Sequence, residues 1–449
     1  MTIRINNISL DINEDLSLLK NKVAKKLRMS KDEIGDIKII KESLDARKKN
    51  LIKFNYCINI EHEDEEKIVA RLNDKDVKID RVHDNDVRID NSKYEPDVEP
   101  GNEILNHRPV VVGLGPAGLF AALLLAKKGF NPIVFERGED VDSRTKTVEE
   151  FWRTGELNPE SNVQFGEGGA GAFSDGKLTT RIKDTRCDYV LDALVRNGAP
   201  EEIIYKGKPH VGTDILKNVV KNIREEIKRH GGEVHFNSRF EGIIKKDNKL
   251  KGIKVNGEEV PCEVAILALG HSSRDTYEML FNEGVFMKQK PFAIGVRIEH
   301  PQEIINLSQY GEKYANHPRL KAAEYRLAYQ SKTLDRAVYS FCMCPGGVVV
   351  NASSEEKRLC VNGMSYHARD KENANSALVV TVGPNDFGGE HPLEGMKFQR
   401  HYEELAFKLG GGNYNTPVQL VGDFMKDRVT TKLGKVNPSV LSNGYRFKI

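Results

Sequence analysis

The chain has 449 residues, of which 39% are hydrophobic and 30% are charged, and its formal net charge is +2 at pH 7. This length and composition exclude a disordered or fibrous protein, and two or three packed domains are expected. The near-neutral charge argues against nucleic acid as a partner, because nucleic-acid binding relies on a strongly basic surface.

The N-terminus has no apolar targeting segment, and the longest apolar run, residues 119–126, is too short to span a bilayer. We therefore expect a cytoplasmic protein with no membrane partner. The six cysteines lack the spacing of a disulfide framework, which fits a reducing compartment. Cys342 and Cys344 are close in sequence, but in a regular strand their parallel side chains are too far apart for a disulfide. No histidine or cysteine spacing indicates a metal site, and none indicates an oligomeric state.

Residues 1–92 are predicted to form a small N-terminal α+β domain. Residues 3–12 alternate like a strand, residues 15–29 have helical periodicity, and residues 36–62 are typical of two strands around a charged turn.

A local duplication follows, in which RLNDKDVKID at 71–80 precedes RVHDNDVRID at 81–90. Two copies are too few for a solenoid, so we interpret them as a solvated strand pair or linker. The polar residues 93–107 are predicted to connect this domain to the next.

The glycine pattern at residue 113 is the strongest motif. An apolar strand runs into Gly113-x-Gly115-x-x-Gly118, then a helix, and then a strand that ends at Glu136. The glycines allow a tight turn, close approach of a diphosphate and close helix–strand packing, and the acidic residue can bind ribose hydroxyls. The pattern predicts a dinucleotide site at the positive end of the helix. The candidate cofactor-binding residues here are Gly113, Gly115, Pro116, Ala117, Gly118, Glu136 and Arg137.

The order of the following elements favours FAD over NAD. A polar helix over 141–157 and a second glycine-rich segment over 165–181 come first, then an amphipathic helix whose apolar stripe includes Ile215, Leu216 and Val219. Three short strands and an apolar strand that ends at Gly270 complete a domain predicted over 108–275. This is the order found in flavoproteins with two dinucleotide-binding domains.

From about residue 107 onward the chain resembles the glutathione-reductase-like FAD superfamily. More closely, it resembles a bacterial family of FAD-dependent dehydrogenases, also called NAD(P)/FAD-dependent oxidoreductases. The resemblance rests on FGEGGAGAFSDGKLTTR, KPHVGTD, LALGHSSRD, FCMCPGGVVV and NGMSYHARDKENANSALVV. It implies an α/β fold with a Rossmann-like FAD-binding domain, a mixed α+β substrate domain over 276–432 that contains a mixed sheet, and a C-terminal tail over 433–449.

The resemblance also implies that the second glycine-rich segment passes beside the diphosphate and the flavin; a flexible lid is the alternative interpretation. The backbone of Phe240 would contact adenine and Gly270 would lie near the cofactor, although Leu269 stands where many relatives have threonine. The further cofactor-binding candidates are Gly168, Gly169, Ala170, Gly171, Ser174, Lys177, Phe240 and Gly270.

The candidates for chemistry near the flavin ring are His271, Arg274 and Lys177, with a helix-capping role as the alternative for the histidine. His367, Arg369 and Asp370 are typical either of a pocket for an anionic or polar substrate, or of turns and strand ends.

We therefore expect an FAD-dependent oxidoreductase that transfers hydride between the flavin and an unknown small organic substrate, with NAD(P)H as a possible transient donor. The alternatives are a flavin-dependent RNA-modifying enzyme and an FAD-binding protein without turnover. Because members of the resembled family usually continue past residue 449, the chain is expected to lack their closing C-terminal segment and to retain FAD less tightly.

Overall fold

The computed structural model describes residues 2–80, 96, 98, 100–180, 182 and 184–447. The chain forms two compact units, each built from segments that are separate in the sequence. Unit 1 contains residues 1–99, 177–211 and 303–323, and unit 2 contains residues 100–176, 212–302 and 324–449. The predicted boundaries at residues 92, 107, 275 and 432 stay predictions. The second copy of the duplication, 81–90, lies outside the described residues, as does part of the predicted linker.

Unit 1 is organised by an antiparallel sheet with the strand order β2-β3-β1-β4. Side chains on one face of β1 are buried, including Ile3, Ile5 and Leu10, because the sequence alternates with the period of a strand. The helix and three strands predicted between residues 3 and 62 are confirmed. The elements of this sheet are β1 (Thr2–Asp11), α1 (Leu18–Leu27), β2 (Ile37–Asp45), β3 (Lys53–Ile60), α2 (Glu65–Leu72) and β4 (Val77–Asp80).

Two later segments complete unit 1. Tyr310 and Tyr314 belong to the same buried cluster as β1 and α1, and Lys321 pairs with Glu202 at 2.9 Å. These segments carry α5 (Arg186–Arg196), the 3-10 helix η3 (Glu201–Ile204) and most of α8 (Gln302–Tyr310).

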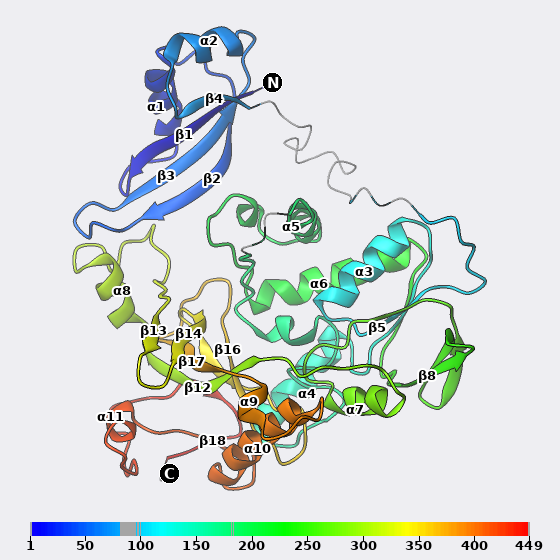
Figure 1. Cartoon of the computed structure of the whole chain (residues 1–449). Helices are drawn as coiled ribbons and strands as arrows, with labels where there is room; N and C mark the ends of the chain where they lie inside the picture. Colours follow the sequence, from blue (N-terminus) through cyan, green and yellow to red (C-terminus); the bar gives the residue numbers. More distant parts are fainter. Residues whose placement is uncertain are drawn as a thin grey trace. The chain divides into compact units, whose positions relative to one another are not determined.

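Unit 2 contains a parallel sheet with the strand order β11-β5-β6-β7. Helix α3 connects β5 to β6, so the predicted strand–helix–strand order is confirmed. Helix α6 lies beside α3 (Figure 1), and the buried pair Lys127–Glu226, at 3.0 Å, joins them. The elements are β5 (Val110–Val112), α3 (Pro116–Lys127), β6 (Ile133–Phe135), α6 (Thr213–Arg229), β7 (Glu233–His235) and β11 (Ala265–Leu267).

The predicted amphipathic helix is confirmed as α6, and the residues of its apolar stripe are buried to different degrees. Val219, Val220 and Ile223 are buried as expected, but Ile215 and Leu216 are only partly buried. Between β7 and β11 the chain forms an antiparallel three-stranded sheet, and α7 contacts its first strand. These elements are β8 (Phe240–Lys246), β9 (Lys249–Val255), β10 (Glu258–Pro261) and α7 (Arg274–Asn282).

The C-terminal part of unit 2 contains a sheet with the order β12-β17-β14-β13. All its pairings are antiparallel, which corrects the predicted mixed sheet; a mixed pairing occurs in a smaller sheet with the order β16-β15-β19. The strands are β12 (Phe292–Pro301), β13 (Ala328–Ser331), β14 (Arg336–Cys344), β15 (Val348–Asn351), β16 (Val361–Met364), β17 (Asn373–Val382) and β19 (Val440–Leu441).

The regular strand geometry expected at Cys342 and Cys344 is wrong. The register of β14 shifts between Phe341 and Cys344, and Cys342 has a φ of +44°. A bulge of this kind interrupts the alternation of side chains between the two faces. Both cysteines are free thiols.

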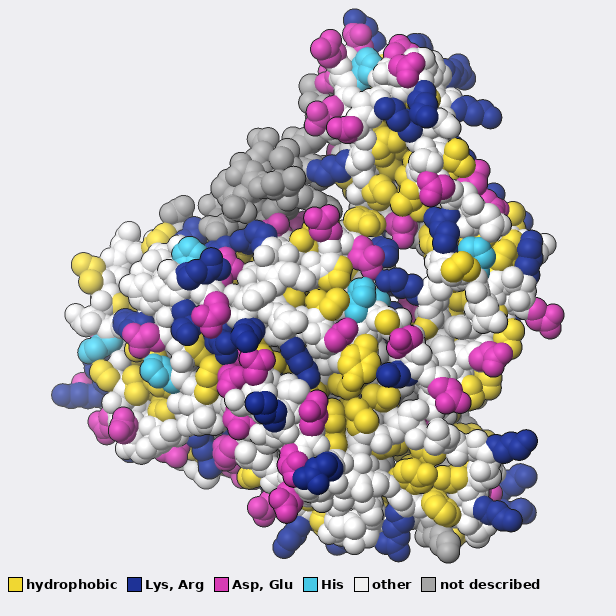
Figure 2. All heavy atoms as spheres, turned by 180° about the vertical axis from the view of Figure 1, so that it is seen from behind, with side chains coloured by type: hydrophobic (Ala, Val, Ile, Leu, Met, Phe, Trp, Pro, Cys, Tyr) yellow, Lys and Arg dark blue, Asp and Glu magenta, His cyan; other side chains and the backbone are white. Residues whose placement is uncertain are grey.

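The remaining elements of unit 2 are α4 (Val141–Thr154), the 3-10 helix η2 (Gly169–Phe173), α9 (Pro384–Phe387), α10 (Glu394–Leu409), β18 (Thr416–Pro417), α11 (Val421–Phe424) and β20 (Tyr445–Arg446). Within the described residues, no helix combines the length and the apolar character needed to cross a membrane. Lysine and arginine side chains are interspersed with aspartate and glutamate on the face shown in Figure 2.

Candidate functional site

Two glycines of the first turn are required by packing. Gly113 has a φ of +94°, and a Cβ there would lie 2.5 Å from the carbonyl oxygen of Ala268. A Cβ at Gly118 would lie 1.8 Å from the carbonyl oxygen of Gly113. The turn between β5 and α3 can therefore carry no side chain at either position.

Gly115, the middle glycine of the motif, has room for a Cβ. Gly115 has a φ of −72°, and a Cβ there would meet only the Cα of Gly169, at 3.8 Å. Gly115 is the N-cap of α3, no side chain caps the helix, and Pro116 occupies its first turn. The positive end of α3 therefore has no side-chain cap, and such an end can bind phosphate groups.

Glu136 joins the two glycine segments. Its Oε2 accepts a hydrogen bond from the Leu114 N–H at 2.7 Å, and its Oε1 accepts from the Gly138 and Gly166 N–H groups at 3.0 Å each. The side chain is 5% exposed. The carboxylate thus organises both loops, and because a carboxylate oxygen can accept two hydrogen bonds, Oε2 keeps capacity for a ribose hydroxyl. The ribose contact stays a prediction.

A buried arginine that the sequence analysis missed anchors the second glycine segment. Arg144, on α4, is 0% exposed and donates only to backbone carbonyls. Burial lowers its pKa to about 10, although the charges of Glu136 and Glu167 act in the opposite direction. It therefore remains charged at neutral pH. Its acceptors, at 2.7–3.3 Å, are the carbonyl oxygens of Asn162, Val163, Gly166, Glu167 and Gly169.

The shape of the segment depends on this arginine. Gly166 has a φ of +113°, and a Cβ there would lie 2.4 Å from the Arg144 Cδ. The guanidinium also lies over the ring of the buried Phe173, 4.9 Å from its centroid. The Gly168 N–H donates to the Leu114 carbonyl oxygen at 2.8 Å, which holds the second segment against the first turn.

Glu167 lies at the centre of the same segment and is buried. Its Oε2 accepts from the Val141 N–H at 2.8 Å and from Arg224 at 2.9 Å, whereas its Oε1 has no partner among the described residues. Burial raises the pKa of this carboxyl, and the hydrogen bond from Val141 and the charge of Arg224 oppose the effect.

The end of the segment is held by further polar contacts. The Ser174 hydroxyl donates to the Gly171 carbonyl oxygen at 2.8 Å and accepts from the Gly176 N–H at 3.0 Å, so it closes a turn. The buried Asp175 accepts from Arg369 at 2.9 Å and from Ser365. Arg369 therefore forms a buried ion pair with the glycine segment.

The neighbours of Arg369 in the sequence have different environments. His367 donates its backbone N–H to Asp214 at 2.8 Å, and Asp370 is exposed. These contacts do not place His367, Arg369 and Asp370 together around one pocket.

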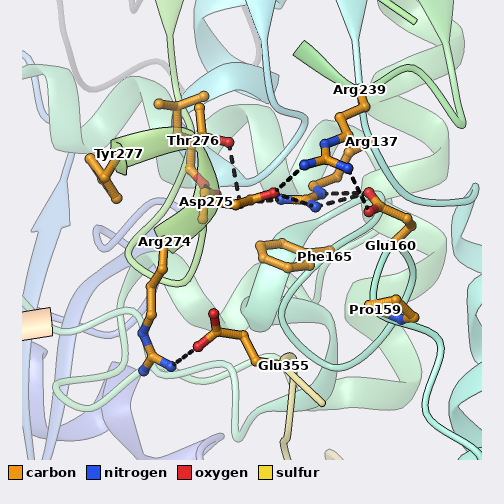
Figure 3. A network of polar contacts seen from close by, with 12 residues as sticks. Arg137, Pro159, Glu160, Phe165, Arg239, Arg274, Asp275, Thr276, Tyr277 and Glu355 are labelled. Atoms are coloured by element: carbon orange, nitrogen blue, oxygen red, sulfur yellow. Dashed lines mark hydrogen bonds and ion pairs between the residues drawn. The ribbon is translucent and has the colours of Figure 1, made fainter. Parts of the chain in front are cut away.

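A charged cluster lies beside Phe240. Arg137 contacts Asp275 at 3.0 Å and Glu160 at 2.9 Å, and Arg239 contacts the same two carboxylates at 2.9 and 3.5 Å (Figure 3). Burial raises the pKa of Asp275, but the hydrogen bonds and charge of Arg137 outweigh it, so that pKa lies below its ordinary value. Arg137 is thus paired within the protein.

A cavity of about 270 Å³ opens at this cluster. It is lined by Phe240 and Asp275, together with Arg239 and Thr276. This places Phe240, the predicted neighbour of adenine, at a space that could receive a ring. The adenine contact stays a prediction.

The residues that follow β11 have separate environments. Gly270 has a φ of +70°, and no atom lies within 4 Å of a Cβ added there, so a ligand can approach its backbone. His271 is exposed, and partial removal from water together with the Arg274 charge lowers its pKa. Arg274 is buried and contacts Glu355 and Glu403 at 2.6 Å each.

Lys177 belongs to unit 1, where its backbone forms a bridge with His210. The catalytic roles predicted for His271, Arg274 and Lys177 all stay predictions. The ion pairs of Arg274 with Glu355 and Glu403 give it a structural role, whether or not it also takes part in catalysis.

The described residues fit the diphosphate part of FAD. Three features suit it: the start of α3 has no side-chain cap, a Cβ at Gly115 would meet only the Gly169 Cα, and no atom lies within 4 Å of a Cβ added at Gly270. Ala117, Ala170 and Gly171 belong to the two segments that border it.

Two family models match the chain. Residues 291–448 match the family described as FAD-dependent protein, C-terminal domain-like. Residues 2–61 match a domain of unknown function, DUF8436.

In Clostridium beijerinckii an uncharacterized protein is 63% identical over 448 residues, covering 100% of this chain and 82% of that protein. Protein FixC of Salmonella typhi is 25% identical over 203 residues, 44% of each chain. A probable electron transfer flavoprotein-quinone oxidoreductase of Escherichia coli is 24% identical over 169 residues, 36% of each chain. The chain thus aligns with less than half of these last two proteins.

Among solved structures, a halogenase PltM variant in complex with FAD is 13% identical, with a TM-score of 0.33, and the match covers 66% of this chain and 55% of that one.

Proposed function

We propose that this chain, which belongs to the same family as its 63% identical Clostridium beijerinckii relative, is an FAD-dependent oxidoreductase that binds FAD across its two glycine-rich segments. We further propose a small organic molecule as its substrate, NAD(P)H as a transient donor, and the cytoplasm as its location.

One observation carries this proposal. Glu136 accepts backbone hydrogen bonds from both glycine segments at the open start of α3. A dinucleotide site has two such features. A carboxylate after the second strand binds the ribose, and a helix start without a capping side chain binds the diphosphate.

When bound, FAD supplies the hydride chemistry, and the protein supplies position and electrostatics. The N–H groups at the start of α3 would hold the diphosphate, and Glu136 would orient the ribose. Gly115 and Gly270 would allow the backbone to approach the cofactor. His271, beside Gly270, is the exposed candidate for contact with substrate.

The test is the visible absorption spectrum of the purified chain, with the released chromophore identified by mass. Glu136→Gln is compared with Glu258→Gln, which changes an exposed carboxylate on β10. We expect FAD in the wild type and the control, and weaker retention in Glu136→Gln, because the amide NH2 cannot accept the backbone hydrogen bonds. A colourless wild type that also fails to bind added FAD would contradict the proposal.

Anaerobic mixing with NADH, NADPH and candidate substrates then separates the alternatives. Reduction of the bound flavin supports the oxidoreductase. Stoichiometric FAD without reduction by any donor supports a binding protein without turnover. Retardation of bulk transfer RNA in a gel would support an RNA-modifying enzyme, for which the interspersed charges in Figure 2 give no support.

A further inference from the structure

A second cavity, of about 340 Å³, opens between α7, the start of β12 and α10. We call it the α7–α10 cavity. Its size falls in the range of small-molecule sites in proteins. It lies just after the carboxyl end of β11, and ligands of parallel α/β sheets bind at that edge. The residues that carry the argument are His271, Tyr277, Lys288, Lys290, Phe292 and Met396.

The walls of this cavity are held by buried ion pairs. Arg274, at the start of α7, donates to Glu403 of α10 at 2.6 and 2.8 Å and to Gln399 at 3.2 Å. Arg400 of α10 pairs in turn with Glu278 of α7. Two sets of polar contacts thus join α7 to α10 beside the cavity.

The lining has cationic groups and no acidic group. Lys288 and Lys290 line the cavity together with His271, and no aspartate or glutamate does. Among the described residues, neither lysine has an ion-pair partner; Lys288 lies only over the ring of Phe286, 5.5 Å from its centroid.

Two carboxylates on the helices that border the cavity are already paired with arginines. Glu403 binds Arg274, and Glu278 binds Arg400. Lys288 and Lys290 are exposed residues that line this cavity, so their charge would attract a ligand anion to it.

The remaining wall is apolar and aromatic. Phe292 and Met396 line it together with Tyr277, and Met287 and Leu393 extend the apolar surface. A cavity with such walls and a few charged groups suits a ligand with an apolar body and one charged end. A fully hydrated ion such as sulfate would gain little from these walls.

We propose that the α7–α10 cavity binds a small organic carboxylate with an apolar or aromatic body. The lysines contact the carboxylate, and Phe292 and Met396 contact the body. The cavity shares His271 with the proposed substrate site, and Tyr277 donates to the Gly270 carbonyl oxygen at 2.8 Å, so this inference extends the proposed function. None of its lining residues belongs to the two glycine segments, so carboxylate binding can be measured separately from FAD binding.

The experiment is ¹⁹F NMR titration of the full chain with 4-(trifluoromethyl)benzoate and with its neutral analogue 4-(trifluoromethyl)benzamide. The variant Lys288→Gln/Lys290→Gln is compared with Lys249→Gln/Lys251→Gln, which removes the same charge from exposed positions of β9. Each titration is run with and without excess FAD.

We expect the benzoate to bind about tenfold more tightly than the benzamide, because two partly exposed ion pairs contribute this much together. The Lys288→Gln/Lys290→Gln variant should lose this preference, and the β9 control should keep it. Equal affinity for the two probes, no binding of the benzoate, or equal behaviour of the two variants would overturn the proposal. Displacement of the benzoate by FAD would also overturn it, because the cavity would then belong to the cofactor.

Discussion

Arg144 shows how one residue can shape a loop without touching a ligand. Its guanidinium bonds only to carbonyl oxygens of the second glycine segment, and among the described residues it makes no ion pair. The Gly166 carbonyl oxygen also accepts from the Gly169 N–H, at 2.9 Å. A buried carbonyl that is left without a donor when its bond to Arg144 is lost costs about 1–3 kcal/mol.

We therefore predict that Arg144→Lys weakens FAD binding by about tenfold or more and lowers the free energy of unfolding by about 2 kcal/mol, because an ammonium cannot reproduce the planar fork. Arg229→Lys, on the exposed end of α6, is the control. FAD titration and urea unfolding measure the two effects. Unchanged FAD affinity in Arg144→Lys would exclude a role in shaping the cofactor site.

Gly166 supplies a second test of the same contact. Alanine there meets two penalties, the left-handed backbone and the clash with the Arg144 Cδ at 2.4 Å. Gly257 has a similar left-handed φ of +81° but no atom within 4 Å of a Cβ, so Gly257→Ala measures the backbone penalty alone. That penalty is about 1–2 kcal/mol. Urea unfolding should show Gly166→Ala to be destabilised by about 1–3 kcal/mol more than Gly257→Ala; equal losses would contradict the described packing.

At the scale of elements, ion pairs connect α7 to α10. Burial raises the pKa of Glu355, but its hydrogen bonds from Arg400 and Arg274 and their charges outweigh this and hold the pKa below its usual value. A carboxylate with a lowered folded-state pKa stabilises the fold above its unfolded pKa of about 4.3, and this contribution disappears as the pH falls through the folded value.

Glu355→Gln should therefore lower the free energy of unfolding by about 2 kcal/mol at neutral pH, because it leaves Arg274 and Arg400 short of a charge partner. Below about pH 4 the difference from wild type should shrink, since the wild-type carboxyl becomes protonated. The exposed neighbour Glu356 provides the control Glu356→Gln. Urea unfolding across this pH range checks the prediction, and a difference that stays constant with pH would contradict it.

Local patterns in the sequence were sufficient to predict the strand–helix–strand unit around Gly113, because its apolar runs and glycines act over few residues. The short elements α2 and β10 were missed, since each is too short to show a clear period. The bulge at Cys342 and the pairing of Arg274 with Glu403 depend on contacts far apart in sequence, which a single sequence does not reveal.

At the scale of the whole molecule, the chain leaves unit 2 after Gly176 and returns to it at Gly212. Amino-acid composition does not reveal these passages between the two units. A sequence indicates a domain boundary only where a polar, extended linker marks it. The candidate site shows the same limit: the glycines and Glu136 were predictable from a local motif, whereas Arg144 is one charged residue in an ordinary polar helix.

The central claim is that the open start of α3 holds the diphosphate of FAD, and the most direct measurement is FAD affinity in Gly115→Ala. Its new Cβ would meet only the Gly169 Cα, at 3.8 Å, so the variant should fold with a loss under about 1 kcal/mol. Gly422→Ala, where no atom lies within 4 Å, is the control. The account predicts that Gly115→Ala loses at least about tenfold in FAD affinity, or about 1.4 kcal/mol, while the control keeps it. Equal affinity in both variants would contradict the claim.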